Sequence, residues 1–170
     1  RTERIVLREM KMADLEAFYG FTGAMEEPVL QAFLKENPTA SEEHFKSYLT
    51  SMYPLYDYGM WTVEDAEKKE ILGICGLGRA CIWKEGEEVE VTDLGYYLRP
   101  ESRGQGLALE AADLTLAYAK DYLELQEIYA LVTEENRPSV RFLEKIGFSR
   151  ENACRAERKG VLVYKKEFLE

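Results

Sequence analysis

The stretch of residues 93–108 (DLGYYLRPESRGQGLA) constrains the fold of this chain more than any other: an apolar strand stops at a proline, and a glycine-rich turn then opens a helix. The first turn of a helix has unpaired backbone N–H groups and the positive end of the helix dipole, so it attracts anions. Gly104 and Gly106 lack the Cβ atoms that would keep a phosphate from the backbone. Arg103 adds a positive charge beside them. The stretch predicts a phosphate cradle.

The helix after the cradle is expected to run to about residue 122. Its apolar residues fall on two neighbouring stripes, which is helical periodicity: Leu107, Ala111, Leu114 and Tyr118, and beside them Ala108, Ala112, Thr115 and Ala119.

Two familiar phosphate-binding motifs do not fit the glycine turn. The P-loop needs Gly-Lys followed by Ser or Thr, and the dinucleotide fingerprint needs a third glycine where Leu109 stands. Residues 103–108 instead fit Arg/Gln-x-x-Gly-x-Gly/Ala. An ordinary glycine turn before a helix is the alternative.

The acidic charge of the chain is unevenly distributed. The net charge is −10 over 170 residues, with −9 in residues 1–102 and −1 in residues 103–170. Such a surface disfavours nucleic acid as a partner and suits a cationic acceptor such as an amine. Selection for solubility alone is the alternative. The length predicts a single domain over residues 1–170.

Cysteine and histidine usage argues against a metal site. The three cysteines, Cys75, Cys81 and Cys154, show no Cys-x-x-Cys spacing, and His44 is the single histidine. We expect three buried, inert thiols, no metal, and a reduced, cytoplasmic setting. We also expect no membrane segment and no signal peptide, because no apolar run approaches the length of a span.

The order of elements predicts a mostly antiparallel sheet with helices. Three successive strands separated by charged turns form a meander. The third of these changes phase: Val89 and Val91 share one parity, and Leu94, Tyr96 and Leu98 share the other, so we expect a β-bulge between Thr92 and Gly95. The expected strands are 3–9, 59–64, 71–83, 88–99, 127–133, 148–153 and 161–168. The expected helices are 13–22, pieces within 27–54 broken at Pro28 and Pro38 with a capping box at 39–42, 100–122, and 136–146 ended by Gly147.

A second motif follows the strand at 127–133. Asn136, Ser139 and then Glu-Lys-x-Gly-Phe at 144–148 are similar to the second conserved block of the GNAT acyltransferase superfamily, whose acyl-CoA-binding motif residues 103–108 resemble. Residues 3–9 (ERIVLRE) and 93–102 (DLGYYLRPES) look like the branch of ribosomal-protein N-terminal acetyltransferases. The resemblance spans nearly the whole chain in the family's order. It implies an α+β fold, an α/β sandwich with a central, mostly antiparallel mixed sheet flanked by helices.

The resemblance also implies the co-substrate, acetyl-CoA, and the residues that bind it. Its pyrophosphate would lie on the backbone amides of the cradle beside Arg103, and its pantetheine arm would pair with the strand end. Asn136 would contact the arm from the other side, with Ser139 near the sulfur. Leu107 as core, and Asn136 and Ser139 as helix caps, are the alternatives. The expected contacts are Tyr96, Tyr97, Leu98, Arg103, Gly104, Gln105, Gly106, Leu107, Ala108, Asn136 and Ser139.

Direct attack of an amine on a thioester requires a base, because an ammonium has no lone pair. Asp93 is the first candidate, since it interrupts an apolar strand at the expected bulge; Glu90 is the second, and a solvent-facing role is the alternative. A backbone N–H near Leu98 would serve the oxyanion. Many family members carry a tyrosine seven residues after the asparagine, but here that position is Leu143. Ser139 or water would then protonate the thiolate.

The expected function is N-acetyl transfer from acetyl-CoA to a primary amine in a ternary complex. The acceptor would be a protein N-terminal amine or a small amine, and the protein a monomer or homodimer. A non-catalytic acyl-CoA-binding or sensing domain and a structural protein with an ordinary glycine turn are the alternatives. An aromatic segment would select the acceptor or serve as core: Tyr19, Phe21, Phe33, Phe45, Tyr48, Tyr53, Tyr56 and Tyr58.

Overall fold

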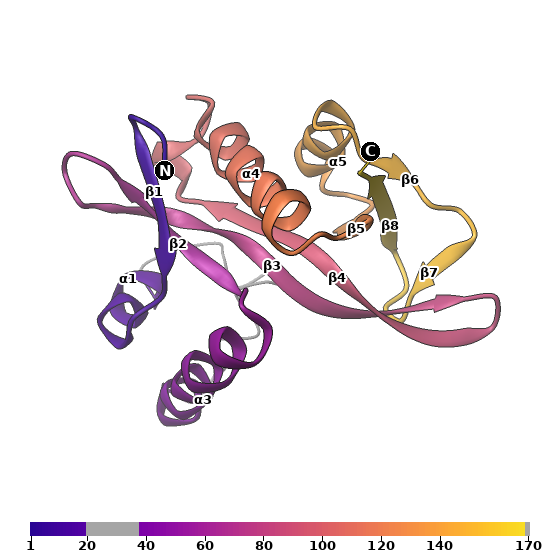
Figure 1. Ribbon diagram of the computed structural model, residues 1–170, viewed down its shortest axis with the longest axis horizontal. Coiled ribbons are helices and arrows are strands. Elements are labelled where there is room, and N and C mark those ends of the chain that lie inside the picture. The colour runs from indigo at the N-terminus through magenta and orange to yellow at the C-terminus, as the bar shows by residue number, and fades with distance from the viewer. Residues whose placement is uncertain (20–37, 169–170) are drawn as a thin grey trace. The chain divides into compact units, whose positions relative to one another are not determined.

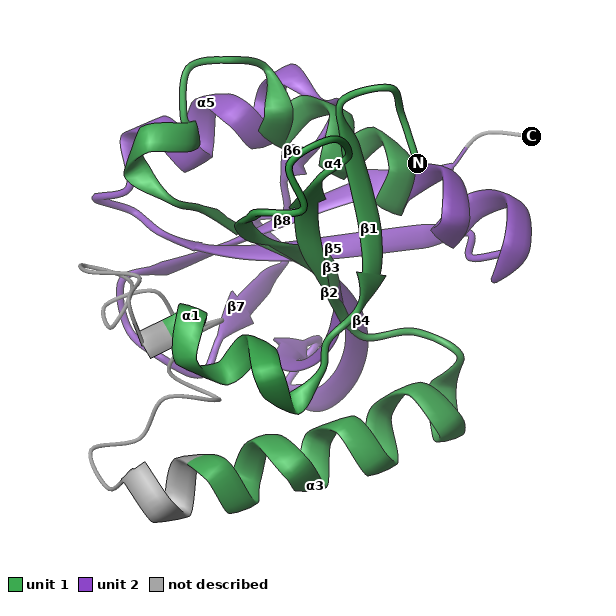
Figure 2. Cartoon of the chain, turned by 90° about the vertical axis from the view of Figure 1, so that its left-hand side faces the viewer, with its two compact units in different colours: residues 1–76, 95–115 green, residues 77–94, 116–170 purple. Residues whose placement is uncertain are grey.

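The computed structural model of the chain describes residues 1–19 and 38–168 (Figure 1). These residues form two compact units that alternate along the sequence (Figure 2). Unit 1 comprises residues 1–76 and 95–115, and unit 2 comprises residues 77–94 and 116–170. Two strands, β3 (Ile71–Lys84) and β4 (Glu87–Leu98), and helix α4 (Leu107–Ala117) begin in one unit and end in the other. The single domain over residues 1–170 stays a prediction.

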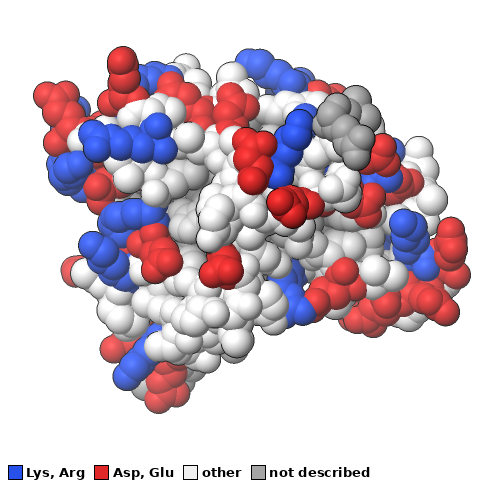
Figure 3. Space-filling view, in the orientation of Figure 1, with Lys and Arg blue, Asp and Glu red and all other residues white. Residues whose placement is uncertain are grey.

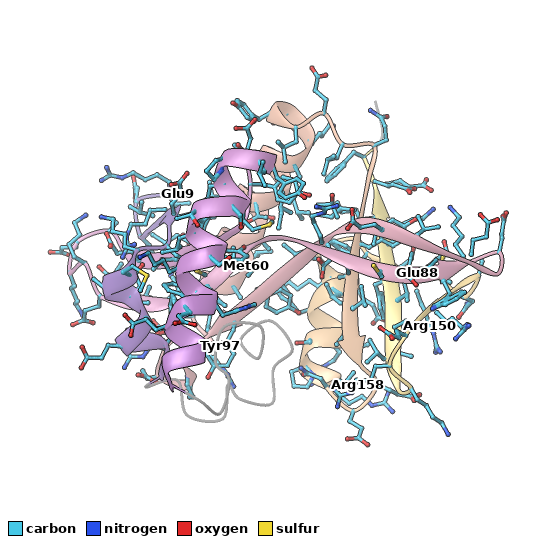
Figure 4. The ribbon with its side chains drawn as sticks, turned by 90° about the horizontal axis from the view of Figure 1, so that it is seen from below. Glu9, Met60, Glu88, Tyr97, Arg150 and Arg158 are labelled. Carbon is cyan, nitrogen blue, oxygen red and sulfur yellow. The ribbon has the colours of Figure 1, made fainter. Side chains whose placement is uncertain are left out.

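Unit 1 contains antiparallel strands, as the sequence predicts. β1 (Ile5–Glu9) pairs with β2 (Met60–Asp65), and β2 pairs with the first half of β3. A 3-10 turn, η1 (Met12–Asp14), leads into α1 (Leu15–Tyr19), and α3 (Pro38–Tyr56) precedes β2. The apolar faces of these elements meet in one core: Met10, Leu15, Phe18, Phe45, Met60, Ile74 and Tyr97. Figure 4 labels Met60 and Tyr97 among these side chains.

Helix α3 corrects the prediction for residues 27–54. It begins at Pro38 and continues through Pro54 to Tyr56, so Thr39 is its second residue and the capping box predicted at 39–42 is wrong. Proline suits a first helical position, since its missing N–H would have no partner there. Pro28 and the aromatic residues Phe21 and Phe33 lie outside the described residues.

The aromatic side chains of α3 hold the start of β2. The Tyr53 hydroxyl donates to the Met60 carbonyl at 2.5 Å and accepts from the Met10 amide at 3.1 Å. The Tyr48 hydroxyl accepts from the Met60 amide at 2.8 Å. Phe45 is fully buried. These three residues are therefore core and anchoring residues, one of the two roles expected for the aromatic segment.

Arg8, in the ERIVLRE motif of residues 3–9, belongs to a buried cluster of ion pairs. Arg8 makes two hydrogen bonds to the Asp14 carboxylate, at 2.8 and 2.9 Å, and a third to Glu64 at 2.7 Å. Asp14 also accepts from the Thr62 hydroxyl and the Lys11 amide. Burial disfavours the Asp14 carboxylate, but these hydrogen bonds, led by Arg8, outweigh it and hold its pKa below the usual value. The cluster ties β1 to β2 and η1.

Unit 2 contains the mixed part of the sheet. β5 (Glu127–Thr133) pairs antiparallel with β8 (Val161–Glu167) over seven residues and parallel with β4 at Asp93 and Tyr129. β6 (Ser149–Arg150) pairs with β8, and β7 (Cys154–Ala156) pairs with the end of β3. The mostly antiparallel mixed sheet flanked by helices is confirmed. The tail holds three strands rather than the two predicted, because β7 is too short to give a sequence pattern.

The helices of unit 2 follow their sequence signals. α5 (Arg137–Lys145) turns Val140, Leu143 and Ile146 into the core, and Gly147 ends it with φ +89°. The predicted helix of residues 100–122 starts later: a 3-10 turn, η3 (Pro100–Ser102), and the glycine turn precede α4, which is followed by a π-helical turn, η4 (Tyr118–Tyr122). The buried core of unit 2 comprises Ile82, Tyr129, Cys154, Ala156 and Val163.

The thiols differ in exposure. Cys75 and Cys154 are buried, and burial raises the pKa of Cys75 to about 12. Cys81 is exposed, so the prediction of three buried thiols is wrong for this residue, which lies on β3 where its side chain faces outward. Among the described residues, no helix is long and apolar enough to cross a membrane.

Candidate active site

The end of β4 leads into α4 through the glycine turn that the sequence predicts. Pro100 stops the strand and begins η3, where the Ser102 and Arg103 amides donate to the Arg99 and Pro100 carbonyls. Gly104 and Gly106 have φ of +73° and +79°. Residues other than glycine rarely adopt these values. Glycine is therefore favoured at both positions because it allows the positive φ, and also because it has no Cβ atom to fill the space beside the turn.

The turn presents backbone donors that no carbonyl within α4 can accept. The first helical hydrogen bond of α4 runs from the Glu110 amide to the Gly106 carbonyl at 3.2 Å, so the amides of Leu107, Ala108 and Leu109 precede it. A Cβ atom built at Gly104 would meet nothing within 4 Å, which leaves this side of the turn open. Open backbone with such amides at a helix N-terminus fits a pyrophosphate.

Arg103 is exposed, and two contacts hold its side chain against the strand. Its Nε donates to the Leu98 carbonyl at 2.8 Å, and its guanidinium lies 5.1 Å from the centre of the Tyr97 ring. Gln105 bends back in a similar way, with Nε2 donating to the Glu101 carbonyl at 3.0 Å. Arg103 thus keeps a positive charge beside the glycine turn, as predicted.

Buried side chains restrict how the strand end can bind a ligand. Tyr97 and Leu98 are only 4% and 7% exposed, and Leu107 is 7% exposed. Gly73 of β3 packs so closely here that an added Cβ atom would lie 2.1 Å from the Tyr97 carbonyl oxygen. These three buried residues can therefore offer only backbone atoms to a ligand, and the alternative reading of Leu107 as a core residue is confirmed. Tyr96 is partly buried.

Asp93 is the carboxylate of β4 with an unusual environment. It is partly buried at the single register position that joins β4 to β5. Burial raises its pKa to about 6, against a smaller opposite effect of its own backbone N–H. A Cβ atom built at Gly78 of β3 would lie 2.9 Å from Asp93 Oδ1. The carboxylate thus occupies space that only glycine leaves.

The second candidate base, Glu90, lies in a different setting. Its side chain is half exposed and forms an ion pair with Arg79. β4 pairs with β5 at Asp93 and Tyr129. This pairing does not test the β-bulge expected between Thr92 and Gly95, which stays a prediction. The raised pKa of Asp93 suits a base near neutral pH.

The residues at the start of α5 serve the helix itself. The Asn136 side chain accepts from the Ser139 amide at 3.3 Å, so Asn136 is the N-cap of α5. Leu143, at the position where the family resemblance leads us to expect a tyrosine, is 1% exposed and belongs to the core. The capping role of Asn136 is confirmed, and contacts of Asn136 and Ser139 with a ligand stay predictions.

The predicted residues fall into two groups. Unit 1 brings together Tyr96, Tyr97 and Leu98 with the turn and Arg103–Ala108, whereas Asp93, Asn136 and Ser139 belong to unit 2. Sequence reasoning missed Gly78, whose only signal was its place in a glycine-punctuated strand. It also missed Arg4, which donates a hydrogen bond to the Gln105 carbonyl. Within residues 1–19 and 38–168, no group of three His, Cys, Asp or Glu side chains could hold a metal ion.

Comparison with known proteins identifies relatives of the chain. The uncharacterized protein YkkB of Bacillus subtilis is 30% identical over 112 residues, which cover 66% of this chain and 63% of YkkB, so the match spans less than two thirds of that protein. The uncharacterized N-acetyltransferase p20 of Bacillus licheniformis is 26% identical over 157 residues, 91% of this chain and 84% of p20. The spermidine N(1)-acetyltransferase of Escherichia coli K12 is 39% identical over 52 residues, 31% of this chain and 28% of that enzyme.

Solved structures show the same fold. An acetyltransferase from Agrobacterium tumefaciens matches with a TM-score of 0.78 and 25% identity, covering 99% of this chain and 93% of that one. A chimera of the Vibrio cholerae spermidine N-acetyltransferase SpeG and hSSAT matches with a TM-score of 0.70 and 21% identity, covering 96% and 95%.

A family model settles the assignment. The acetyltransferase (GNAT) domain matches residues 4–149, a range that contains the glycine turn, Asp93 and the capped start of α5. The narrower resemblance to ribosomal-protein N-terminal acetyltransferases stays a prediction. The chain belongs to the GNAT acetyltransferase family, whose members use acetyl-CoA as co-substrate, and it is an acetyltransferase.

Proposed function

We propose that this enzyme transfers the acetyl group of acetyl-CoA to a primary amine by direct attack within a ternary complex, with Asp93 as the base. The partly buried Asp93 carboxylate, whose pKa is about 6, is the observation that carries the proposal. At pH 7 to 8 such a carboxylate is mostly ionised and still able to accept a proton. The amine nitrogen attacks the thioester carbon, its proton passes to Asp93, and the C–S bond breaks.

Acetyl-CoA would bind through the turn between β4 and α4. The amides of Gly104, Gln105, Gly106, Leu107 and Ala108, with Arg103 beside them, would hold its pyrophosphate. The open space at Gly104 supports this assignment. The pantetheine arm would pair with the backbone of residues 96–98, and Asn136 would contact it in addition to capping α5. A backbone N–H near Leu98 would stabilise the oxyanion, but the Arg99 amide is already bonded to the Leu72 carbonyl.

The departing thiolate needs no strong acid. A thiolate is a good leaving group, with a thiol pKa of about 8.5. Ser139 or a water molecule would protonate it, because Leu143 supplies no hydroxyl group.

The acceptor would be a small amine or a protein N-terminus. The relatives named as spermidine acetyltransferases favour a small amine, and the acidic charge of residues 1–102 would attract a cation. Figure 3 shows acidic and basic side chains mixed on the viewed face, so the net charge, rather than a patch of one sign on that face, supports this choice. We propose a cytoplasmic enzyme that acts as a monomer or a homodimer.

The test is an acceptor screen that detects released CoA thiol. Spermidine, short diamines, single amino acids and peptides with free N-termini are offered with acetyl-CoA. The wild type should acetylate at least one class, the Asp93→Ala variant should lose turnover while binding acetyl-CoA with unchanged Kd, and Glu90→Gln should remain active. Full turnover by Asp93→Ala would disprove its role as base, and activity lost only in Glu90→Gln would transfer that role to Glu90.

A further inference from the structure

Contacts between the N-terminal segment and the glycine turn are not explained by the reaction above. Arg4, which lies just before β1, donates from Nη1 to the Gln105 carbonyl at 2.9 Å. Its Nε donates to Glu110 Oε1 at 2.6 Å, and its Nη2 forms an ion pair with the same oxygen. A Cβ atom built at Gly106 would lie 3.5 Å from Arg4 Nη2. The guanidinium therefore lies beside the turn, although more than a hundred residues separate them in sequence.

Thr2 completes the contacts with Glu110. Its hydroxyl donates to Glu110 Oε2 at 2.8 Å and accepts from the amides of Arg4 and Ile5 at 3.2 and 3.1 Å. Both oxygens of the Glu110 carboxylate are thus occupied. The hydrogen bond from Arg4, followed by that from Thr2, holds the pKa of Glu110 below its usual value, so the carboxylate stays charged and paired.

An acid at this position conflicts with the binding of a phosphate. Glu110 lies in the first turn of α4, where a carboxylate stabilises the helix through its dipole. A pyrophosphate bound at the same N-terminus would be repelled by that carboxylate. An arginine paired with the acid removes the conflict and leaves the amides of the turn available to an anion.

We propose that Arg4 and Thr2 are positioning residues of the acetyl-CoA cradle: they neutralise Glu110 and hold the Gln105–Gly106 turn in the conformation that receives the pyrophosphate. The inference rests on the proposed function, because it assigns both residues to the same phosphate site. It also gives residues 2–4, which precede β1, a role in co-substrate binding.

The test is a set of acetyl-CoA dissociation constants, measured by calorimetry on the full chain. Arg4→Ala should raise Kd about tenfold, since one uncompensated charge near a pyrophosphate costs on the order of one factor of ten. Glu110→Gln should bind at least as tightly as the wild type. The double variant, Arg4→Ala with Glu110→Gln, should return to within about threefold of the wild type, because the charge that Arg4 balances is gone.

Two further variants serve as a control and a reserve. Arg155→Ala removes the same charge from an exposed arginine that lies over Trp83 in unit 2, and should leave Kd unchanged. Thr2→Val takes one hydrogen bond from Glu110 and should raise Kd about twofold; it provides the test if Arg4→Ala fails to fold.

The outcomes separate this inference from the proposed function. A wild type that does not bind acetyl-CoA would overturn the cradle itself. A wild type that binds, with Arg4→Ala or Thr2→Val binding equally well, would overturn only the role of these residues. A double variant as weak as Arg4→Ala would overturn neutralisation of Glu110.

Discussion

Replacing Asp93 by asparagine should make the protein more stable at neutral pH while it abolishes catalysis. The pKa of this carboxyl is about 6 in the folded protein, against 3.8 for an ordinary aspartate. Between these values the unfolded chain releases a proton that the folded chain retains, so stability falls as pH rises. The difference of about two pKa units corresponds to about 3 kcal/mol, at 1.36 kcal/mol per unit. The contribution is fully present below pH 3.8 and fully lost above pH 6.

Urea unfolding of the wild type and Asp93→Asn at pH 4.5, 6 and 7.5 measures this effect. An asparagine does not ionise, so the variant should gain stability relative to the wild type as pH rises, and about 2 kcal/mol of the full change falls between pH 4.5 and 7.5. Glu90→Gln, at a half-exposed carboxylate of the same strand, serves as the control and should show a flat difference. A difference between Asp93→Asn and the wild type that stays constant across this range would refute the reasoning.

The activity of Asp93→Asn should fall although its stability rises. Removing a general base costs typically 10² to 10⁴ in rate, and the acidic limb of the wild-type profile near pH 6 should vanish in Asp93→Asn. Acetyl-CoA should bind this variant with unchanged Kd, since the cradle lies in residues 103–108. A gain in stability with a loss of activity is the trade-off expected where a buried, destabilised group takes part in catalysis.

Three other substitutions test the structure around the site. Gly78→Ala should move the acidic limb of the kcat/KM profile above pH 6, because its methyl group would crowd Asp93 Oδ1 and exclude water from it; an unmoved limb would deny Gly78 a positioning role. Asp14→Ala should lower the free energy of unfolding at pH 7 by about 3 kcal/mol, since it leaves Arg8 short of a buried partner. The difference in free energy of unfolding between the wild type and Asp14→Ala should shrink below pH 3.8, because the Asp14 carboxylate, whose pKa is depressed, takes up a proton there. A loss of stability that does not depend on pH would contradict this. Leu143→Tyr should destabilise by about 1 to 3 kcal/mol rather than restore a proton donor, because the position is filled core; faster turnover by this variant would disprove the core assignment.

The elements with strong local patterns were predictable from sequence. β2, β3, β4 and β5 lie within a residue or two of the expected ranges, and Gly147 ends α5 as its place after a helical stretch indicates. β7 has three residues and depends on its pairing with the distant end of β3, so no local signal announces it. The start of α3 was misplaced because a Ser/Thr-x-x-Glu pattern competed with a proline that suits the first helical turn equally well.

The site was predictable where a residue's chemistry acts through the backbone, and less so where it depends on a partner. Gly104 and Gly106 were identified from the turn alone, and their positive φ values confirm why glycine is needed. The closeness of Gly78 to Asp93, and of Arg4 to Gly106, depends on strand pairing and on contacts between distant segments. Only three-dimensional structure supplies these.

The alternation of the two units along the chain has a consequence for biosynthesis. Unit 1 is incomplete until residue 115 has been made, and unit 2 needs both residues 77–94 and the last third of the chain. A ribosome adds about 5 to 20 residues per second, so β3 and β4, which are neighbours in the sheet, are made several seconds before β5 and β8. During that interval the nascent chain exposes unpaired strand edges, which are sites of association with other chains. We expect expression at lower temperature or with added chaperones to raise the folded yield more than substitutions within either unit.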